Sequence, residues 1–476
     1  MYEGIYEGMY DGIIVGAGAA GLMAAASVAD ETEYSTHGPE YSTHGPEYST
    51  HGPAYSTHGP AYSTHISNAS QATTFPHLSK FLVLEKNTQA GRKLLLSGSG
   101  QCNFTHTGPI DAFLSHYGDG GNVGERGRFV RAALTAFTNT DLIVWFERRG
   151  VPAVVTPAGK VFPRSMRATD LRNTLLAAAH NGQVPIRYGD AVEQIEQTAN
   201  GFEVVTRQGQ RFQTRTVLLT TGGFTYPATG SQGDGYRFAE RLGHHVIPAR
   251  VALVSIRTRD YASLWAEVAG VSLQGIAVTL TNSRFRRAQT FTGDLLFTHR
   301  GLSGPVILEM SRYLNVGDRL VVSLVPQHSA ETVATFERTG DGNGILRVRK
   351  FLKTVGIPER LTQCVMRRLG MASDQTISQL PRSLRCALCD AVTAAEFVVT
   401  GFGGRGEAMV TAGGVDRREV FSKTMESRIC PGVFFAGEIL DVDGDTGGYN
   451  LQFAFSSAKL AVRKMDEMGR ERRVPS

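Results

Sequence analysis

The sequence has few cysteines, no long apolar run and only a small excess of positive charge. Five cysteines in 476 residues form no disulfide framework. No apolar stretch approaches the length that spans a bilayer, and the first residues lack the basic and apolar regions of a signal peptide. We therefore expect a cytoplasmic protein without membrane contact. The net charge of +5 is small for this length and by itself predicts no polyanionic partner.

Metal chemistry has little support in the sequence. Cys386 and Cys389 have the spacing of a redox pair or of half a zinc site, but no second pair accompanies them. Their segment has a helical pattern, which favours two thiols on a helix face. We predict no metal site. The length of 476 residues is too great for one compact domain and predicts two or three.

The clearest motif is the glycine loop Gly16-Ala17-Gly18-Ala19-Ala20-Gly21, which lies between an apolar run at 11–15 and an alanine-rich segment at 22–29. A strand, this loop and a helix are typical of a site that holds a dinucleotide pyrophosphate at a helix N-terminus. Gly16 permits the tight turn, Gly18 the close approach of the phosphates, and Gly21 the packing of helix on strand. The alternative is a glycine-rich turn before an ordinary packing helix. The motif does not distinguish FAD from NAD.

A seven-residue repeat, Glu-Tyr-Ser-Thr-His-Gly-Pro, occupies residues 33–65 and restarts at 33, 40, 47, 54 and 61, with alanine as its first residue in the last two units. The Gly-Pro pair in each unit blocks both a helix and a central strand. The histidines of the repeat could bind a metal ion. The near-identity of the units instead favours tandem duplication of a surface loop. We predict that residues 33–79 form a disordered insertion.

Glu85 ends a second apolar run at 81–84. In dinucleotide-binding domains an acid at this strand end, about 20 residues beyond the glycine loop, holds the ribose hydroxyls. The spacing from Gly21 to Glu85 is 64 residues, of which the repeat accounts for 33, so the insertion conceals an ordinary spacing. An ordinary strand-end acid is the alternative.

Small residues recur at the ends of further apolar runs. They fill 97–103, follow the run at 217–220, and follow the run at 433–436. Apolar strands that stop at small residues bring backbone to the carboxyl edge of a sheet, where nucleotides bind. A helix predicted from residue 453 would begin near Gly447 and Gly448, whose free N–H groups and positive dipole end suit an anion. The pattern indicates one nucleotide fold closed by both ends of the chain, with a separate β domain at 249–330 and helices at 331–395.

Several short motifs occur in the same order along the chain as in a known protein family. They lie at 84–87, 91–93, 97–103, 161–163, 221–236, 297–305, 411–415, 423–427 and 437–452. On these residues the sequence resembles the HI-type, YhiN/BaiN-like flavoproteins, a family of NAD(P)/FAD-dependent oxidoreductases. The resemblance implies an α/β fold with a discontinuous FAD-binding Rossmann-like domain of the two-dinucleotide type. Its parts would be 1–248 and 396–476, with an inserted β-barrel at 249–330 and a small helical domain at 331–395.

The resemblance also implies an activity. Family members reduce carbon–carbon double bonds by hydride transfer from flavin N5, with NAD(P)H as a candidate transient reductant. Some resemble enzymes that make dihydrouridine in ribosomal RNA and others act on steroid-like molecules, so a small-molecule enoyl reductase is the alternative. A flavin-carrying interaction protein without turnover is a second alternative. One loop departs from the family pattern, since Ser99 and Gln101 replace a glycine and an arginine. Gln101 lacks the fixed positive fork that arginine offers to a carbonyl or an anion.

The expected contacts of the cofactor follow from these motifs. They are Gly16, Gly18, Ala19, Ala20, Gly21, Glu85, Lys86, Arg92, Lys93, Ser97, Gly98, Gly100, Cys102, Asn103, Thr221, Gly222, Gly437, Glu438, Gly447, Gly448, Tyr449 and Asn450. Reduction of a double bond also needs a positioned acid. Cys102, in the loop expected to face the flavin ring, is the first candidate, and His299 is the second. A small buried side chain at Cys102 and a backbone-bonded loop histidine at His299 are the alternatives.

A basic insert supports a nucleic-acid partner. Between residues 336 and 390 there are ten Lys or Arg against five Asp or Glu. Eight of these cations form the predicted phosphate-binding face for ribosomal RNA: Arg347, Arg349, Lys350, Lys353, Arg367, Arg368, Arg382 and Arg385. A solvated helical face is the alternative. The oligomeric state does not follow from the sequence.

Overall fold

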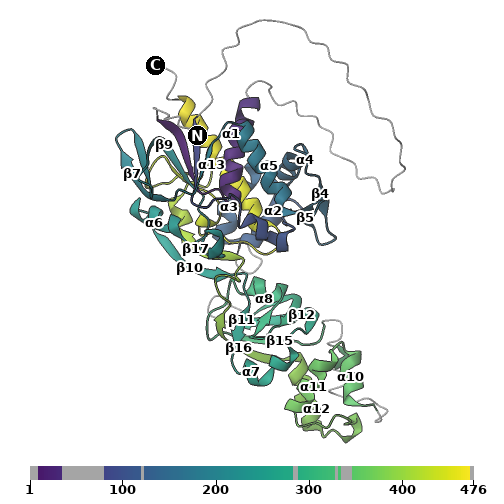
Figure 1. Cartoon of the computed structure of the whole chain (residues 1–476). Helices are drawn as coiled ribbons and strands as arrows, with labels where there is room; N and C mark the ends of the chain where they lie inside the picture. Colours follow the sequence, from purple (N-terminus) through teal and green to yellow (C-terminus); the bar gives the residue numbers. More distant parts are fainter. Residues whose placement is uncertain are drawn as a thin grey trace, which may run out of the picture.

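The computed structural model describes residues 9–34, 80–118, 123–281, 288–326, 331–333 and 346–471. Figure 1 shows a larger α/β part that contains both ends of the described chain, followed by a β-barrel and a group of helices at the far end. The fold is therefore mixed α/β, as predicted. The repeat lies outside the described residues from residue 35 onward, as does the rest of the predicted insertion to residue 79.

The central sheet is built around β1 (Tyr10–Val15). It pairs in parallel with β2 (Phe81–Glu85) on one side and β9 (Arg211–Leu219) on the other. Next to these, β6 (Ile186–Tyr188) and β18 (Val433–Phe435) also run parallel. The apolar runs predicted as strands at 11–15 and 81–84 are confirmed. Nearly all of β1, all of β2 and the last four residues of β9 are buried, so this part of the sheet is covered on both faces.

Helices from both ends of the chain cover this sheet. The helix α1 (Ala19–Tyr34) packs between α5 (Ala168–Asn181) and α13 (Tyr449–Glu471), as Figure 1 shows. Since β18 and α13 follow the barrel in the sequence but complete the first domain, one domain is made of two separated segments. The discontinuous Rossmann-like domain predicted from the sequence is confirmed.

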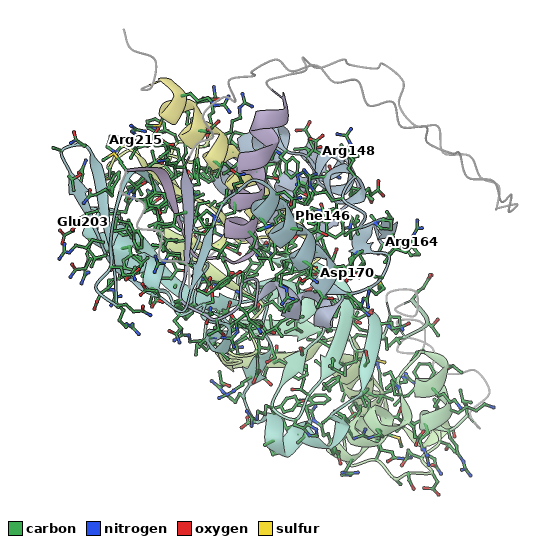
Figure 2. All side chains as sticks on the ribbon, turned by 45° about the horizontal axis from the view of Figure 1, so that its top comes forward. Phe146, Arg148, Arg164, Asp170, Glu203 and Arg215 are labelled. Carbon is green, nitrogen blue, oxygen red and sulfur yellow. The ribbon has the colours of Figure 1, made fainter. Side chains whose placement is uncertain are left out.

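Smaller elements surround the sheet. The first half of β9 pairs antiparallel with β8, which pairs with β7. A separate small sheet has the order β3, β5, β4 and includes the hairpin predicted near 154–163. In Figure 2, Phe146 lies among the surrounding helices, whereas Arg148 and Arg164 lie at the outer surface. The bounds are β3 (Thr105–His106), β4 (Ala153–Val155), β5 (Lys160–Pro163), β7 (Val192–Thr198), β8 (Gly201–Thr206), α2 (Ile110–Phe113), α3 (Gly124–Ala136), α4 (Asn139–Glu147) and α6 (Asp234–Arg241).

Two antiparallel strands, β10 (Val246–Ala252) and β17 (Val410–Val415), connect this domain to a closed barrel. Around the barrel the order is β11, β14, β13, β12, β15, β16. The short helix α8 (Pro305–Met310) lies at the end of the barrel that faces the sheet domain (Figure 1). The bounds are β11 (Ile256–Thr258), β12 (Ser272–Thr281), β13 (Gln289–Phe297), β14 (Leu302–Ser303), β15 (Arg319–Val322) and β16 (Ala395–Phe402).

The helical insert lies between β15 and β16 and includes α10 (Val348–Thr354), α11 (Glu359–Arg368) and α12 (Arg382–Thr393). Its apolar side chains share one core with the barrel, so the two pack as one body. The predicted domain boundary at 395/396 needs correction, because β16 pairs with both β11 and β15 and closes the barrel. The strand pattern at 395–402 is visible in the sequence, but the pattern does not say which sheet the strand joins.

Neither a metal-binding cluster nor a membrane-spanning helix is found among the described residues. Cys386 and Cys389 both lie on α12, and among the described residues no group of three or more His, Cys, Asp or Glu is arranged to hold a metal ion. None of the helices within the described ranges has the length and apolar character needed to cross a membrane.

Candidate functional site

A cavity of about 1010 Å³ runs along the carboxyl ends of the central strands and reaches the N-terminus of α13. Its volume is at the upper end of the range of ligand pockets. The glycine loop lies on its wall, and so do Pro305 and Leu308 from the barrel helix α8. The cavity is therefore built by the sheet domain with a contribution from the barrel.

The three motif glycines differ in what surrounds them. Gly16 has a φ of +102°, and a Cβ on Gly21 would lie 1.9 Å from the Gly16 carbonyl oxygen, so protein packing alone requires glycine at both positions. At Gly18 the nearest protein atom to a Cβ would be the Thr220 oxygen, 4.0 Å away. Gly18 lies on the cavity wall. The space beside it is therefore open to a ligand that approaches the backbone.

Glu85 is buried at the end of β2 and lines the cavity. Its Oε2 accepts a hydrogen bond from the backbone N–H of Ala17 at 2.7 Å. Its Oε1 accepts from the backbone N–H of Asn87 at 2.8 Å and from Asn87 Nδ2 at 2.6 Å. A carboxylate has about four acceptor positions, so capacity for a hydroxyl donor remains. These bonds fix the carboxylate beside the glycine loop.

Lys93 and Glu438 form an ion pair on the cavity wall, with Lys93 Nζ 2.7 Å from Glu438 Oε2. Lys93 Nζ also donates to Thr225 Oγ1 at 2.8 Å, and Glu438 Oε1 accepts from the backbone N–H of Thr411 at 2.7 Å. The other predicted basic contacts are engaged too, since Lys86 pairs with Asp234 and Arg92 donates to Asn87. Lys86 and Lys93 on this wall are therefore each neutralised by a carboxylate, and Arg92 is held by an amide.

Three buried polar atoms of cavity-lining residues lack a hydrogen-bond partner within the described parts of the chain: Asn103 Oδ1, Thr221 Oγ1 and Asp190 Oδ2. Buried polar atoms in folded proteins are almost always hydrogen-bonded. A polar ligand along this wall would satisfy them. Together with the open space at Gly18 and the carboxylate of Glu85, they fit a bound dinucleotide of the FAD type.

The N-terminus of α13 opens onto the far end of the cavity. Gly447 and Gly448 have φ values of +117° and +98°, and a Cβ on Gly448 would lie 2.5 Å from the Thr105 carbonyl oxygen. Only glycine allows this close approach to β3. The Tyr449 ring packs away from the cavity, with its centroid 4.0 Å from that of His116. The backbone at this helix end, rather than the Tyr449 side chain, faces a ligand.

The cavity gathers most of the predicted cofactor residues. Its wall includes Gly16, Gly18, Ala19, Ala20, Glu85, Lys86, Arg92, Lys93, Ser97, Gly98, Asn103, Thr221, Gly222, Glu438, Gly447, Gly448 and Asn450. The wall does not include Gly21, Gly100, Cys102, Gly437 or Tyr449. Residues that the sequence reasoning did not select also line it, notably Asn87, Asp190, Lys160 and Thr446. Asn87 lies within the family motif at 84–87, whereas Lys160 lies just before the motif at 161–163 and had no sequence signal of its own.

Cys102 is fully buried and is absent from the cavity wall, although Asn103 beside it lies there. Its φ of +59° turns the chain so that the side chain enters the protein interior. Burial raises the pKa of the thiol to about 12, and a bond with Ser97 reduces that rise. The surrounding protein separates the thiol from the cavity, and this position gives no support to the predicted role of Cys102 as a proton donor beside the flavin ring.

His299 lies in the exposed turn between β13 and β14 and is also absent from the cavity wall. The carbonyl of its neighbour Thr298 accepts a hydrogen bond from the hydroxyl of Tyr261 at 2.7 Å. Tyr261 begins α7 (Tyr261–Leu264), which Figure 1 shows at the side of the barrel away from the sheet domain. This position gives no support to the predicted role of His299 as a proton donor.

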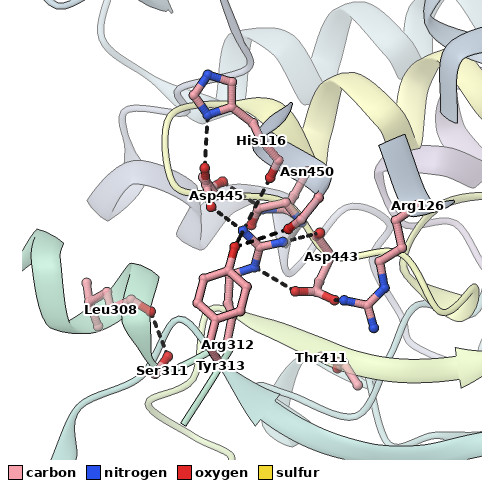
Figure 3. Close-up of polar contacts among 12 residues, drawn as sticks. His116, Arg126, Leu308, Ser311, Arg312, Tyr313, Thr411, Asp443, Asp445 and Asn450 are labelled. Atoms are coloured by element: carbon pink, nitrogen blue, oxygen red, sulfur yellow. Dashed lines mark hydrogen bonds and ion pairs between the residues drawn. The ribbon is translucent and has the colours of Figure 1, made fainter. Parts of the chain in front are cut away.

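A buried ionic cluster, which includes the cavity-lining residue Asp445, was not predicted (Figure 3). Arg312 follows α8, and its Nε lies 2.7 Å from Asp443 Oδ2, while its Nη1 contacts Asp445 Oδ1. Asp445 Oδ2 lies 2.9 Å from His116 Nδ1. Burial opposes ionisation of Asp443, but Arg312 and Arg126 outweigh it and lower the pKa of Asp443. The cluster joins the barrel to the sheet domain.

Sequence reasoning missed this cluster because its partners are far apart in the chain. Asp443 and Arg312 are separated by 131 residues. The alternating acids at 441, 443 and 445 lie within the family motif at 437–452, and they were the sequence signal that could have indicated an ionic cluster. No local pattern indicated that Arg312 would be their cation.

The predicted basic face on the helical insert is partly neutralised. Arg349 pairs with Glu359, and Arg367 lies 2.6 Å from Glu267. The guanidinium of Arg368 lies 4.3 Å from the ring centroid of Trp265. The other predicted cations in this insert, namely Arg347, Lys350, Lys353, Arg382 and Arg385, have no ion pair to an acidic side chain within the described residues.

Comparison with known proteins gives relatives of similar length. The chain is 32% identical over 380 residues to "Ribosomal RNA dihydrouridine synthase" of Escherichia coli (strain K12), covering 80% of this chain and 90% of the relative. It is 31% identical over 382 residues to the protein of the same name from Haemophilus influenzae, covering 79% and 90%. It is also 29% identical over 396 residues to "3-dehydro-bile acid delta(4,6)-reductase" of Clostridium scindens, covering 82% and 93%.

The family match is equally extensive. Residues 68–464 match the family described as "HI0933-like protein Rossmann domain". The matched range begins just after the repeat, which separates β1 and the glycine loop from the rest of the domain. Although β1 lies outside the matched range, it belongs to the same domain, because it pairs with β2 and β9 within the central sheet. By the extent of this match and of its relatives, the chain belongs to the HI0933-like family of flavoproteins.

Proposed function

We propose that the protein is an FAD-dependent oxidoreductase that reduces a carbon–carbon double bond. The observation that carries this proposal is one continuous cavity that joins the glycine loop, Glu85 and the N-terminus of α13. Bound and reduced FAD supplies a hydride from its N5 atom. The protein's part is to bind the cofactor, orient the acceptor, exclude water and deliver a proton.

The residues divide along the cavity. Gly18 and the neighbouring backbone would hold the pyrophosphate, and Glu85 would accept hydrogen bonds from the adenosine ribose. Asn103 and the backbone of Gly447 and Gly448 hold the ring end. When FAD is bound, the positive end of the α13 dipole would favour negative charge on its ring.

The proposed acceptor is a uridine of ribosomal RNA, which would become dihydrouridine. Two relatives that carry the name "Ribosomal RNA dihydrouridine synthase" support this choice. The cations of the helical insert that form no ion pair within the described part of the chain support it too, because they offer charge to a phosphate backbone. A uracil must leave its base stack for its double bond to lie against the flavin. A small-molecule enone is the second candidate, supported by the name of the Clostridium scindens relative.

The proposed reductant is NAD(P)H, bound transiently. Residues 401–406 repeat the Gly-x-Gly-x-x-Gly spacing, but they join β16 to β17 with no helix after them, so they lack the strand, loop and helix of a second dinucleotide site. We further propose that the protein acts in the cytoplasm, where both NAD(P)H and ribosomal RNA are found. Both statements rest on the proposed reaction.

The test starts from the purified holoprotein under anaerobic conditions. NADPH should bleach the flavin absorbance, and ribosomal RNA transcribed in vitro, which contains uridine throughout, should restore it and gain dihydrouridine. Restoration by a 3-oxo-4,6-diene steroid but not by RNA would favour the second candidate. A flavin that NADPH bleaches but that neither acceptor reoxidises would contradict both proposed reactions.

A further inference from the structure

The end of the cavity beside α13 has few groups that can deliver a proton. Among the lining residues of the cavity, the side chains that exchange protons include those of Lys160, Asp445, Thr446, Ser97 and Ser99. Asp445 uses one carboxylate oxygen on Arg312 and the other on His116. The Thr446 hydroxyl is different, because it connects the cavity wall to a second carboxyl group behind it.

That carboxyl group belongs to Glu309. The Thr446 Oγ1 and Glu309 Oε1 atoms lie 2.9 Å apart. Glu309 lies on α8, whose residues Pro305 and Leu308 form part of the cavity wall. Positions 305, 308 and 309 fall on one side of a helix, while Val306, Ile307 and Met310 enter the barrel core. The barrel therefore presents Glu309 to the loop that carries Thr446.

The surroundings of Glu309 favour its neutral form. Burial and the negative charge of Asp445 raise the pKa of Glu309. The bond to Thr446, together with the positive charges of Arg312 and His116, reduces that rise. The Tyr449 hydroxyl on α13 is the other titratable group that interacts with Glu309. A protonated carboxyl group next to a hydroxyl that faces the cavity has the arrangement of a proton relay.

We propose that Thr446 delivers the proton of the reduction and that Glu309 supplies it through the Thr446 hydroxyl. As the double bond receives the hydride that reduced flavin supplies, the proton on Thr446 Oγ1 bonds to the adjacent carbon. The proton on the Glu309 carboxyl group moves to Thr446 Oγ1, and the Glu309 carboxylate later takes a proton from water. Glu309 is thus a positioning residue and proton source, and Thr446 touches the acceptor. The inference rests on the proposed function.

The first measurement needs neither turnover nor cofactor. Infrared difference spectra of the apoprotein, recorded across a pH titration, should show a protonated carboxyl band that persists above the usual range for glutamate. The band should vanish in Glu309→Gln and remain in Glu396→Gln, a control on the outer face of the barrel strand β16. A band that is unchanged in Glu309→Gln would overturn the inference.

The second measurement is the reoxidation of NADPH-reduced holoprotein by uridine-containing ribosomal RNA or by the 3-oxo-4,6-diene steroid. In the wild type the rate should fall as pH rises through the pKa of Glu309. Glu309→Gln and Thr446→Val should lower the rate at least tenfold and remove that dependence on pH, whereas Glu309→Asp and Thr446→Ser should restore part of the rate. Flavin content and the rate of reduction by NADPH, measured for each variant, distinguish slower reoxidation from loss of the cofactor.

The outcomes separate the two proposals. If an acceptor reoxidises the wild type and Glu309→Gln with equal rates and pH profiles, the relay is wrong and the proposed function stands. If Lys160→Met removes the pH dependence instead, the donor is Lys160 and the relay is likewise overturned. If neither acceptor reoxidises the flavin although the Glu309 band titrates as expected, the proposed reactions fail, and the relay fails with them.

Discussion

Lys93 and Glu438 are 345 residues apart in the sequence, yet the Lys93 ammonium lies 2.7 Å from the Glu438 carboxylate on the wall of the cavity. The two residues come from the two separated segments that make one domain. About a quarter of each side chain is exposed, so solvent weakens the attraction only in part. The pair therefore fastens the amino-terminal and carboxyl-terminal segments at the site itself.

Removing one member of this pair should cost more than removing both. Lys93→Met should lower the free energy of unfolding of the apoprotein by about 1–3 kcal/mol, because it leaves Glu438 without its cation. The double variant Lys93→Met, Glu438→Gln should recover part of that loss. A double-mutant cycle followed by urea unfolding measures the coupling. Additive effects of the two substitutions would show that the pair contributes no coupling.

Gly18→Ala should separate cofactor binding from folding. The new methyl group meets no protein atom within 4.0 Å, and the φ of Gly18 is not positive, so the apoprotein should be as stable as the wild type. Because the methyl group enters the space that a pyrophosphate would use, FAD affinity should fall at least tenfold. Gly404→Ala is the matched control, since its Cβ also meets nothing within 4 Å and Gly404 does not line the cavity. Equal FAD affinity in both variants would argue against a pyrophosphate at Gly18.

Glu85→Gln tests the ribose contact. The amide can still accept from Ala17 or Asn87, but it loses the charge that strengthens a bond from a ribose hydroxyl. FAD affinity should fall by about tenfold to a hundredfold, which corresponds to about 1.4–2.8 kcal/mol. Fluorescence quenching of added FAD measures it. Glu203→Gln serves as control, because Glu203 lies on β8 outside the cavity and pairs with Arg211 on β9. Unchanged affinity in Glu85→Gln would remove the ribose role.

Arg312→Ala should be strongly destabilising. It leaves the buried Asp443 without its main cation, and breaking a buried pair in this way costs about 3–5 kcal/mol. Arg319→Ala, on the exposed start of β15, should change stability little. Since the pKa of Asp443 is lowered in the folded protein, its stabilisation exists above the ordinary aspartate range and is lost as pH falls through the lowered value. Urea unfolding from pH 7 to pH 3 should show a weaker acid dependence in Arg312→Ala.

Cys102 should behave as an inert thiol. Because burial raises its pKa to about 12, the native protein should resist alkylation at Cys102 at pH 8, whereas the half-buried Cys386 should react first. Mass spectrometry of peptides after iodoacetamide treatment distinguishes the two. Rapid native alkylation of Cys102 would show that the loop from Ser97 to Asn103 opens in solution and would renew its candidacy as an acid.

The sequence predicted the nucleotide-binding part well because its signals are local. A strand, a glycine loop and a helix follow one another directly, and Glu85 became recognisable once the repeat was subtracted. The orientation of Cys102 did not follow from sequence, because one residue with positive φ decides which way the thiol turns. Glu309 and Arg312 carried no motif, since their roles arise where the barrel meets the loop that ends in α13. Contacts between distant segments depend on the whole fold.

The two-segment construction also constrains how the protein is made. The barrel and helical insert share one core and emerge from the ribosome as a continuous stretch, so they can fold while synthesis continues. The cavity must wait, because β18 and α13 complete its sheet and its ring end. Until residues 433–471 have emerged, the cavity beside the glycine loop of the first segment is incomplete. Capture of the cofactor is thereby deferred until this second segment has been synthesised.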